Sequence, residues 1–321
     1  MTSLTTVAQP EKKARGGMVA WLDAMPHPSL VIEIASTHVA AARWGKDLSH
    51  LIAFAAEQLP EGAVTPSATQ PNIADREAVR GAIRSVLSRV PKQGPDVALL
   101  LPDPSIRVFI LPFDTFPRSA DDALPLLRWR LKKSLPFSAD EAMLSWMRQS
   151  SRDGKVDIVA AVARQKIVKE YESLLEEEGL LAGVVQSSTL ATLPVLNQNG
   201  PTLLARLSGR NLTTVIVRGE TMCVYRSTEL GMDAQGLKPQ AIFDEVFPAV
   251  AFYQDTWGGK VEQMCVAGFG TGEEELRDAL SRELGCPADP LAMSGEFSPE
   301  ARSLVAQGLE PLVGWQMNSG A

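Results

Sequence analysis

The sequence has 321 residues, of which 45% are hydrophobic and 21% are charged, and its formal net charge is −7. This length corresponds to roughly two ordinary domains, and the composition is typical of a globular protein with a substantial core. The negative net charge argues against nucleic acid as the main partner, because binding to phosphates requires a positive field.

Three cysteines, Cys223, Cys265 and Cys286, lie in the last third of the sequence, and none belongs to a CxxC pair. This spacing favours a reducing compartment, so we expect neither disulfides nor a bound metal. No stretch approaches the roughly 18 consecutive apolar residues of a membrane span. We therefore expect a cytoplasmic protein that reaches a membrane only through a partner.

Residues 1–28 form a polar leader that we expect to be flexible. The first clear pattern is at residues 31–42, where an apolar strand enters a turn of small and hydroxyl residues and a second apolar strand leaves it. A helix capped by Asp75 should follow, with an apolar stripe on one face and arginines on the other. We expect the arginine face to be solvated.

Residues 106–188 have the pattern of a strand, a helix, two paired strands, a second helix and a last strand. The first helix has leucines at helical spacing and basic residues near its C-terminal end, where positive charge suits the helix dipole. The paired strands should meet at a turn at residues 151–154. The second helix ends in three consecutive glutamates at residues 176–178, which we expect to face solvent. The whole stretch predicts a compact α+β unit.

The last third of the sequence begins at an Asn-Gly-Pro break and repeats the pattern of residues 31–42. Residues 203–217 predict a strand, a glycine turn and a second strand, and a third strand should follow. A helix should begin at Pro239, and Thr271 with Glu274 would form a capping box for a further helix. Two strand-turn-strand units indicate a duplicated fold.

Taken in order, these elements resemble the PilM-type cytoplasmic proteins of type IV pilus assembly, which are actin-like relatives of the cell-division protein FtsA. The likeness covers residues 29–312 and rests on the order and spacing of stretches at residues 31–42, 101–137, 159–185, 217–226 and 245–270. The resemblance implies an α/β fold, namely a duplicated actin-like ATPase fold with ribonuclease H-like halves and an inserted α+β subdomain of the 1C type.

The resemblance also implies the domain limits. We expect a first actin-like domain at residues 29–199 and a second one at residues 200–312. The inserted subdomain should interrupt the first domain at residues 102–188. A C-terminal tail would follow at residues 313–321.

Several chemically important positions of the family pattern are changed in this chain. The family's first phosphate loop reads Asp-x-Gly-x-x-x-x-Lys, and these places hold Glu33, Ala35 and Ala40 here. The resemblance implies that the Asp orders magnesium-bound water and the Lys meets phosphate, and alanine can do neither. In the second loop Arg206 replaces an Asp, which reverses the charge expected beside magnesium. We expect no catalytic residues and no cofactor, and ATP with magnesium is the disfavoured alternative.

What remains of the nucleotide pocket is a set of positions that could still form hydrogen bonds. They are Ser36, Thr37, Gly209, Thr213, Glu245, Gly268 and Gly270. One alternative function is therefore an ATP-binding protein with slow or no hydrolysis. Another is an unrelated enzyme on the same fold, but the sequence contains no GxSxG, HExxH or GxxxxGK[ST] motif, and Ser36 with His38 has no identifiable third group.

The main expectation is a non-catalytic scaffold of a type IV pilus or type II secretion assembly platform, recruited to the inner membrane and in some settings self-associating. The resemblance implies that its partner is the N-terminal cytoplasmic tail of a single-span inner-membrane protein, bound as an extended peptide beside the inserted subdomain. Apolar side chains would line that groove or, alternatively, form ordinary core. They are Val108, Ile110, Phe113, Phe116, Trp129 and Phe137.

Overall fold

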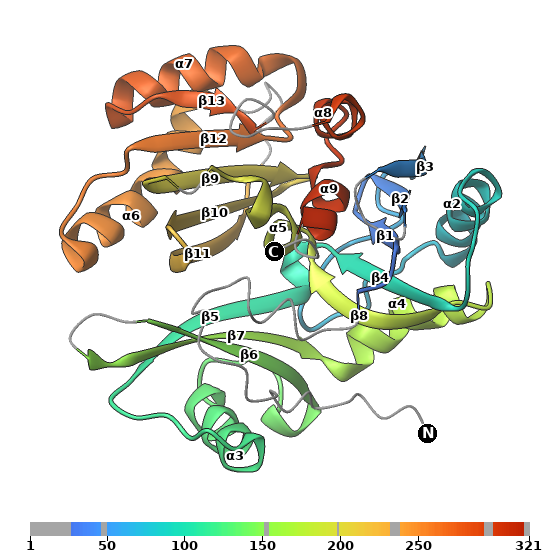
Figure 1. Ribbon diagram of the computed structural model, residues 1–321, viewed down its shortest axis with the longest axis horizontal. Helices are drawn as coiled ribbons and strands as arrows, with labels where there is room; N and C mark the ends of the chain where they lie inside the picture. Colours follow the sequence, from blue (N-terminus) through green and yellow to red (C-terminus); the bar gives the residue numbers. More distant parts are fainter. Residues whose placement is uncertain are drawn as a thin grey trace.

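The computed structural model of the protein describes residues 27–45, 50–150, 154–197, 199–231, 238–291 and 298–317. Figure 1 shows two α/β lobes, with a smaller sheet below them in this view. Of the expected leader, only His27 and Pro28 fall inside these ranges. Most of the turn expected at residues 151–154 and the last part of the expected tail, residues 318–321, lie outside them.

The first lobe is built on a five-stranded sheet with the strand order β3-β2-β1-β4-β8. Its strands are β1 (Leu30–Ile34), β2 (His38–Trp44), β3 (Leu51–Gln58), β4 (Asp96–Leu101) and β8 (Leu181–Ser187). The first three strands pair in antiparallel fashion, whereas β4 pairs with β1, and β8 with β4, in parallel.

Side chains alternate along these strands, so each face of the sheet has its own core. One face packs against α2 (Arg76–Arg89) and α4 (Gln165–Glu176), with Ile32 and Ile83 in the same buried cluster. The other face carries Val31, whose cluster continues into the second lobe. The two lobes therefore share one hydrophobic core at their junction.

The second lobe repeats this design with the strand order β11-β10-β9-β12-β13. Its strands are β9 (Pro201–Ser208), β10 (Asn211–Arg218), β11 (Thr221–Glu229), β12 (Gln263–Ala267) and β13 (Ala288–Pro290), and its helices are α6 (Pro239–Trp257) and α7 (Glu273–Leu284). Again three strands pair in antiparallel fashion, whereas β12 pairs with β9, and β13 with β12, in parallel. This duplicated topology confirms the predicted fold class.

A separate sheet is inserted after β4, with the strand order β5-β7-β6. It contains β5 (Ile106–Phe113), β6 (Ala142–Ser150) and β7 (Val156–Arg164), and α3 (Ala120–Leu131) covers one face. Its strand pairing limits this unit to β5, β6, β7 and α3, which is less than the expected range of residues 102–188. Because β8 pairs with β4 and α4 packs under the first sheet, both elements belong to the first lobe.

The last described helix, α9 (Glu310–Met317), follows α8 (Pro299–Ala306) and packs on α5 (Ser188–Thr192). The contact is so close that a Cβ on Gly314 would lie 2.0 Å from the Ala191 carbonyl oxygen. Trp315 is buried, its indole N–H donates to the Pro28 carbonyl over 3.2 Å, and His27 stacks on its ring. The limit expected at residue 312 therefore falls inside a buried helix.

One local expectation was wrong. The N-cap of α7 is Gly272, which has no side chain that could cap the helix, and Glu273 accepts a hydrogen bond from the Phe269 N–H. The arginine face of α2 is accessible to solvent, as expected, and it also forms ion pairs: Arg76 and Arg84 pair with Glu177 and Glu178 beyond α4 at 2.5 and 2.6 Å. In the described ranges, no helix combines the length and the apolar character needed to cross a bilayer.

Candidate functional site

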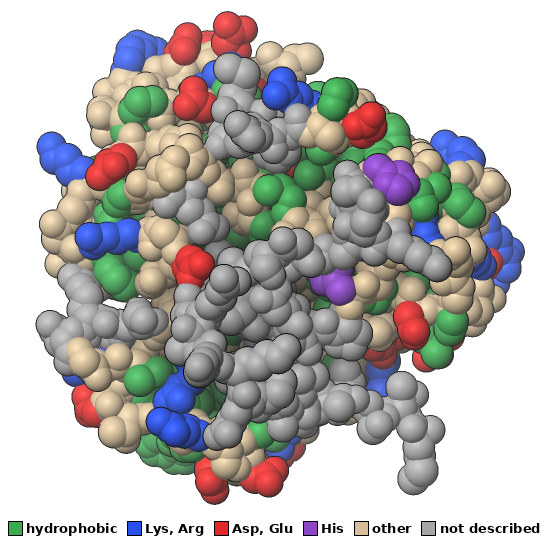
Figure 2. Space-filling model, viewed as in Figure 1, with side chains coloured by type: hydrophobic (Ala, Val, Ile, Leu, Met, Phe, Trp, Pro, Cys, Tyr) green, Lys and Arg blue, Asp and Glu red, His purple; other side chains and the backbone are tan. Residues whose placement is uncertain are grey.

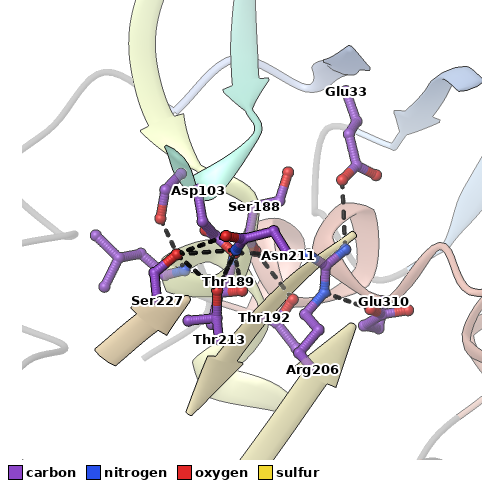
Figure 3. A network of polar contacts seen from close by, with 12 residues as sticks. Glu33, Asp103, Ser188, Thr189, Thr192, Arg206, Asn211, Thr213, Ser227 and Glu310 are labelled. Atoms are coloured by element: carbon purple, nitrogen blue, oxygen red, sulfur yellow. Dashed lines mark hydrogen bonds and ion pairs between the residues drawn. The ribbon is translucent and has the colours of Figure 1, made fainter. Parts of the chain in front are cut away.

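A buried arginine lies at the junction between the lobes, surrounded by three carboxylates (Figure 3). Arg206, near the end of β9, donates from Nε to Glu310 Oε1 over 2.6 Å. Its Nη2 lies 3.5 Å from Glu33 Oε1, and its Nη1 lies 3.9 Å from Asp103 Oδ2. Glu33 comes from β1, Glu310 from the first turn of α9, and Asp103 from the 3₁₀ turn η1 (Asp103–Ser105). The cluster thus ties together elements from both lobes.

Burial sets the electrostatics of this cluster, because none of these four side chains is more than 3% exposed. Desolvation acts to lower the pKa of Arg206, but Glu310, Glu33 and Asp103 outweigh it and raise that pKa above its ordinary value. Desolvation likewise acts to raise the pKa of Glu33, but His38 and Arg206 leave it lowered. Arg206 and Glu33 are therefore held in their charged forms.

Asp103 is also the centre of a second layer of the network, in which its hydrogen-bond donors are uncharged groups. Its carboxylate accepts hydrogen bonds from the Thr189 N–H and hydroxyl, from Thr213 Oγ1 at 2.8 Å and from Tyr225 OH at 3.2 Å. Burial and the neighbouring Asp103 raise the pKa of Tyr225 well above its ordinary value, so it remains a donor. Asn211 donates to Thr213 in turn, over 3.0 Å. Hydrogen-bond donors from both lobes thus keep Asp103 satisfied.

The two turns that occupy the places of the family's phosphate loops touch each other. Gly209, with φ +60°, is packed so closely against the first turn that a Cβ there would lie 2.3 Å from Ser36 Oγ. Next to Ser36, Thr37 Oγ1 lies 3.0 Å from His38 Nδ1, and His38 Nε2 is 3.5 Å from Glu33 Oε2. At this point the two facing turns are in close contact.

The remaining predicted pocket residues are Gly268, Gly270 and Glu245, and the first of them lies against the second turn. Gly268 has φ +86°, and a Cβ there would lie 2.0 Å from the Leu207 carbonyl oxygen, so close packing explains this glycine. Gly270 also has a positive φ, but nothing lies close to it. Glu245 on α6 accepts a hydrogen bond from Arg226 on β11 over 2.9 Å. Of the seven predicted positions, Thr213 joins the buried network, and Ser36 and Gly209 meet at its edge.

The charges buried at the junction oppose the entry of ATP with magnesium. Phosphates carry negative charge, and here they would have to enter a buried region that already holds three carboxylates and one guanidinium. Arg206 stands where the family pattern has an acidic residue beside magnesium, and it is already engaged by Glu310. In the described part of the chain, no group of three or more His, Cys, Asp or Glu side chains is arranged to hold a metal ion.

The sequence missed most of this network. Asp103 and Glu310 were not singled out, nor were Thr189 and Tyr225. Their one shared signal is a polar side chain in an otherwise apolar stretch, which is common in any protein and cannot reveal the partner. Arg206 was noted because it reverses the charge expected beside magnesium, and its pairing with carboxylates of its own chain was not predicted.

The six predicted groove residues do not form one surface. Val108 and Ile110 lie on the face of β5 that packs on the core shared by the lobes, beside β11. Three phenylalanines lie on the opposite side of this sheet, with α3: Phe113, Phe116 and Phe137. Trp129 on α3 is 73% exposed. Alternation along β5 therefore splits the expected groove between two faces.

A side-chain clamp holds the three-stranded sheet to the second lobe. The amide of Gln149 on β6 donates to the Met222 carbonyl over 2.7 Å and accepts from the Met222 N–H over 3.0 Å. Both bonds are buried, and they fix the inserted sheet against the start of β11. The surface that carries Val108 and Ile110 is thereby held in a defined position.

Comparison with known proteins shows which fold this chain has. The chain matches no protein-family model, and no curated protein matches it. Among solved structures, a chain of a PilM–PilN type IV pilus biogenesis complex superposes with a TM-score of 0.73 at 17% identity, covering 92% of this chain and 100% of that one. This protein has the actin-like ATPase fold. The resemblance predicted from the sequence is thus matched in structure, at the level of the fold.

Two further structures are more distant. A Bacteroides thetaiotaomicron protein with an actin-like ATPase fold has a TM-score of 0.48 at 10% identity, covering 88% of this chain and 94% of that chain. The cytoplasmic domain of EpsL, an inner-membrane component of the type II secretion system of Vibrio cholerae, has a TM-score of 0.48 at 11% identity, covering 84% and 96%. At this level of similarity they carry no argument about function.

Proposed function

We propose that this protein is a non-catalytic scaffold of an inner-membrane assembly platform, of the type IV pilus or type II secretion kind. One observation supports the non-catalytic part above all others: Arg206 and its three carboxylates fill the junction where the two phosphate turns of the fold meet. The fold match to a chain of a PilM–PilN complex supports the assembly role. In this proposal the protein is cytoplasmic and is recruited to the inner membrane by a partner.

The proposal for nucleotide follows from electrostatics. An incoming triphosphate would have to displace Glu310 or Glu33 from Arg206, which leaves a buried carboxylate without its counter-charge. Removing one partner of a buried ion pair costs about 3–5 kcal/mol. We therefore expect ATP binding to be weak at best, and magnesium-dependent hydrolysis to be absent.

Thermal unfolding with ATP and magnesium tests this first part. A ligand that binds only the folded state raises the melting temperature by mass action, so we expect no shift at millimolar ATP. A clear ATP-dependent shift that is lost in the Glu33→Gln variant would instead favour the alternative of a nucleotide-binding protein with slow or no hydrolysis. Hydrolysis measured on the same samples separates that alternative from an active ATPase.

We further propose that the N-terminal cytoplasmic tail of a single-span inner-membrane protein binds where the inserted sheet meets the lobes. Val108 and Ile110 are half-buried there, on a strand whose other edge pairs with β7. An extended peptide can pair with a strand edge and fill pockets with alternate side chains. The position of these two side chains at the lobe junction favours this face over the α3 side.

Calorimetric titration with such a tail peptide tests the second part. The Ile110→Gln variant should weaken binding by about tenfold, which corresponds to about 1.4 kcal/mol. Trp129→Ala is the matched control, because it removes an apolar side chain from the α3 side of the same subdomain. A tail peptide that fails to bind the intact protein, or one that is released by Trp129→Ala and not by Ile110→Gln, would contradict this placement.

A further inference from the structure

The outward face of α3 presents an exposed tryptophan. Ala123, Leu127 and Leu131 are the buried side of this helix, and they pack on the three-stranded sheet. Trp129 lies two positions from both Leu127 and Leu131, which places it on the opposite side of the helix. With 73% of its surface exposed, it is the most exposed of the large hydrophobic side chains described.

Basic side chains cluster around this tryptophan. They are Arg128, Arg130, Lys132 and Lys133, all within four residues of Trp129. The ion pairs described in the same subdomain, Lys155–Asp114 and Arg164–Glu141, involve other side chains. The buried Arg128 Nε has no hydrogen-bond partner. The positive charge at this end of α3 is therefore not neutralised by the contacts that the structure shows.

The nearest acidic residues of the same helix are far enough away to leave this charge effective. Asp121 and Asp122 stand in the first turn of α3. A rise of about 1.5 Å per residue puts them roughly 15 Å from Lys132 along the helix axis. This distance exceeds the screening length of about 8 Å at physiological ionic strength.

The 3₁₀ turn η2 (Ala139–Glu141) also contacts α3 and brings two carboxylates near this end. Glu141 is paired with Arg164, so Asp140 is the one left to offset the four basic side chains. An approaching surface would thus meet a reduced but positive local field, although the whole chain carries a net charge of −7.

We propose that this end of α3, the α3 patch defined by Trp129 and its four basic neighbours, rests directly on an anionic lipid bilayer. Tryptophan and long basic side chains together suit the membrane interface, where the ring lies at headgroup level and the charges meet lipid phosphates. Figure 1 shows α3 on the outer side of the inserted sheet, away from both lobes. A tryptophan that projects from a convex helix fits a flat bilayer. An acidic peptide would need a groove, so the bilayer is the better partner for this surface.

This contact is additional to the proposed recruitment by a partner and uses the other side of the subdomain. The sequence predicted membrane contact only through the partner. A direct contact would orient the inserted sheet relative to the bilayer once the tail is bound. The two proposals fail separately, because tail binding depends on the face with Ile110 and lipid binding on the α3 patch.

Vesicle flotation with the full chain tests the proposal. Vesicles of phosphatidylcholine alone should not retain the protein, and vesicles containing phosphatidylglycerol should. The Lys132→Glu/Lys133→Glu double variant should weaken binding to the anionic vesicles by about tenfold or more, since each basic residue at the surface adds severalfold affinity. Trp129→Ser should also weaken it, whereas Lys132→Arg/Lys133→Arg should retain it.

The matched control is Lys166→Glu/Lys169→Glu, which makes the same change of net charge at exposed positions of α4. It should leave vesicle binding unchanged. An equal loss in this control would mean that only net charge matters and would overturn the proposal, as would no binding of the wild type to anionic vesicles. Loss of tail-peptide binding in the α3 variants, with vesicle binding intact, would assign the patch to an acidic peptide and overturn it too.

Discussion

Arg206 acts as an internal counter-charge for both lobes. It sits on β9 of the second lobe, yet its partners come from β1, from the turn after β4 and from the last described helix. A side chain of the second lobe thus connects the two lobes.

We expect Arg206→Met to destabilise the protein by about 3–5 kcal/mol, because it leaves buried carboxylates without their counter-charge. Chemical unfolding monitored by circular dichroism measures this. Arg226→Met is the matched control: its pair with Glu245 is more than a third exposed on both sides, and such pairs contribute about 1 kcal/mol or less. Equal losses of stability in the two variants would mean that the buried cluster stabilises the protein no more than an exposed ion pair does.

Glu33 predicts a pH dependence. Its pKa in the folded protein lies below its usual value of 4.5, because His38 and Arg206 outweigh desolvation. The ionised carboxylate therefore contributes stability that is complete above pH 4.5 and is lost as the pH falls through the lower folded pKa. Unfolding curves measured on both sides of that value should show that Glu33→Gln loses less stability on acidification than the wild type. Parallel curves would contradict the shift.

At the scale of elements, the contact between α9 and α5 closes the junction. Gly314 lets the two helices approach, since a Cβ there would meet the Ala191 carbonyl oxygen. Glu310 in the first turn of the same helix reaches Arg206. A change in the helix packing should therefore also disturb the ion cluster.

Gly314→Ala should lower stability by about 1–3 kcal/mol, as overpacked cores do. Gly81→Ala is the control, because this glycine lies in α2 with nothing within 4 Å of its Cβ position. That change should be neutral or stabilise by about 0.5–1 kcal/mol, since alanine is the better helix former. Thermal and urea unfolding of the two single variants give the comparison. A tolerated Gly314→Ala would show that α9 can shift without cost.

The elements themselves were largely predictable from the sequence. Apolar runs and turn residues located the strand-turn-strand unit of each lobe, and Pro239 marked the start of α6, whereas β13, α8 and α9 were not predicted. Assignment of elements to units was less successful: α4 and β8 follow the inserted strands in sequence but join the first lobe in space. Local periodicity defines a strand, but the neighbour that a strand pairs with depends on residues far away in the chain.

At the scale of the whole molecule, the sequence predicted the duplicated fold but not the ion cluster buried between the lobes. Arg206 and Glu33 are 173 residues apart, and Arg206 and Glu310 are 104 apart. No local pattern connects such positions. The sequence showed that residues for phosphate and magnesium were missing, whereas the structure shows what stands in their place.

The position of α9 has a consequence for how the protein is made. This helix is synthesised after every other described element, yet it packs on α5 and on the sheet that begins at Leu30. On the ribosome, the first lobe would emerge early with one side of its core uncovered. It would stay so until residue 317 had left the exit tunnel. A nascent chain of this kind depends on its last helix to complete its first domain, and during synthesis its apolar surface is open to chaperones.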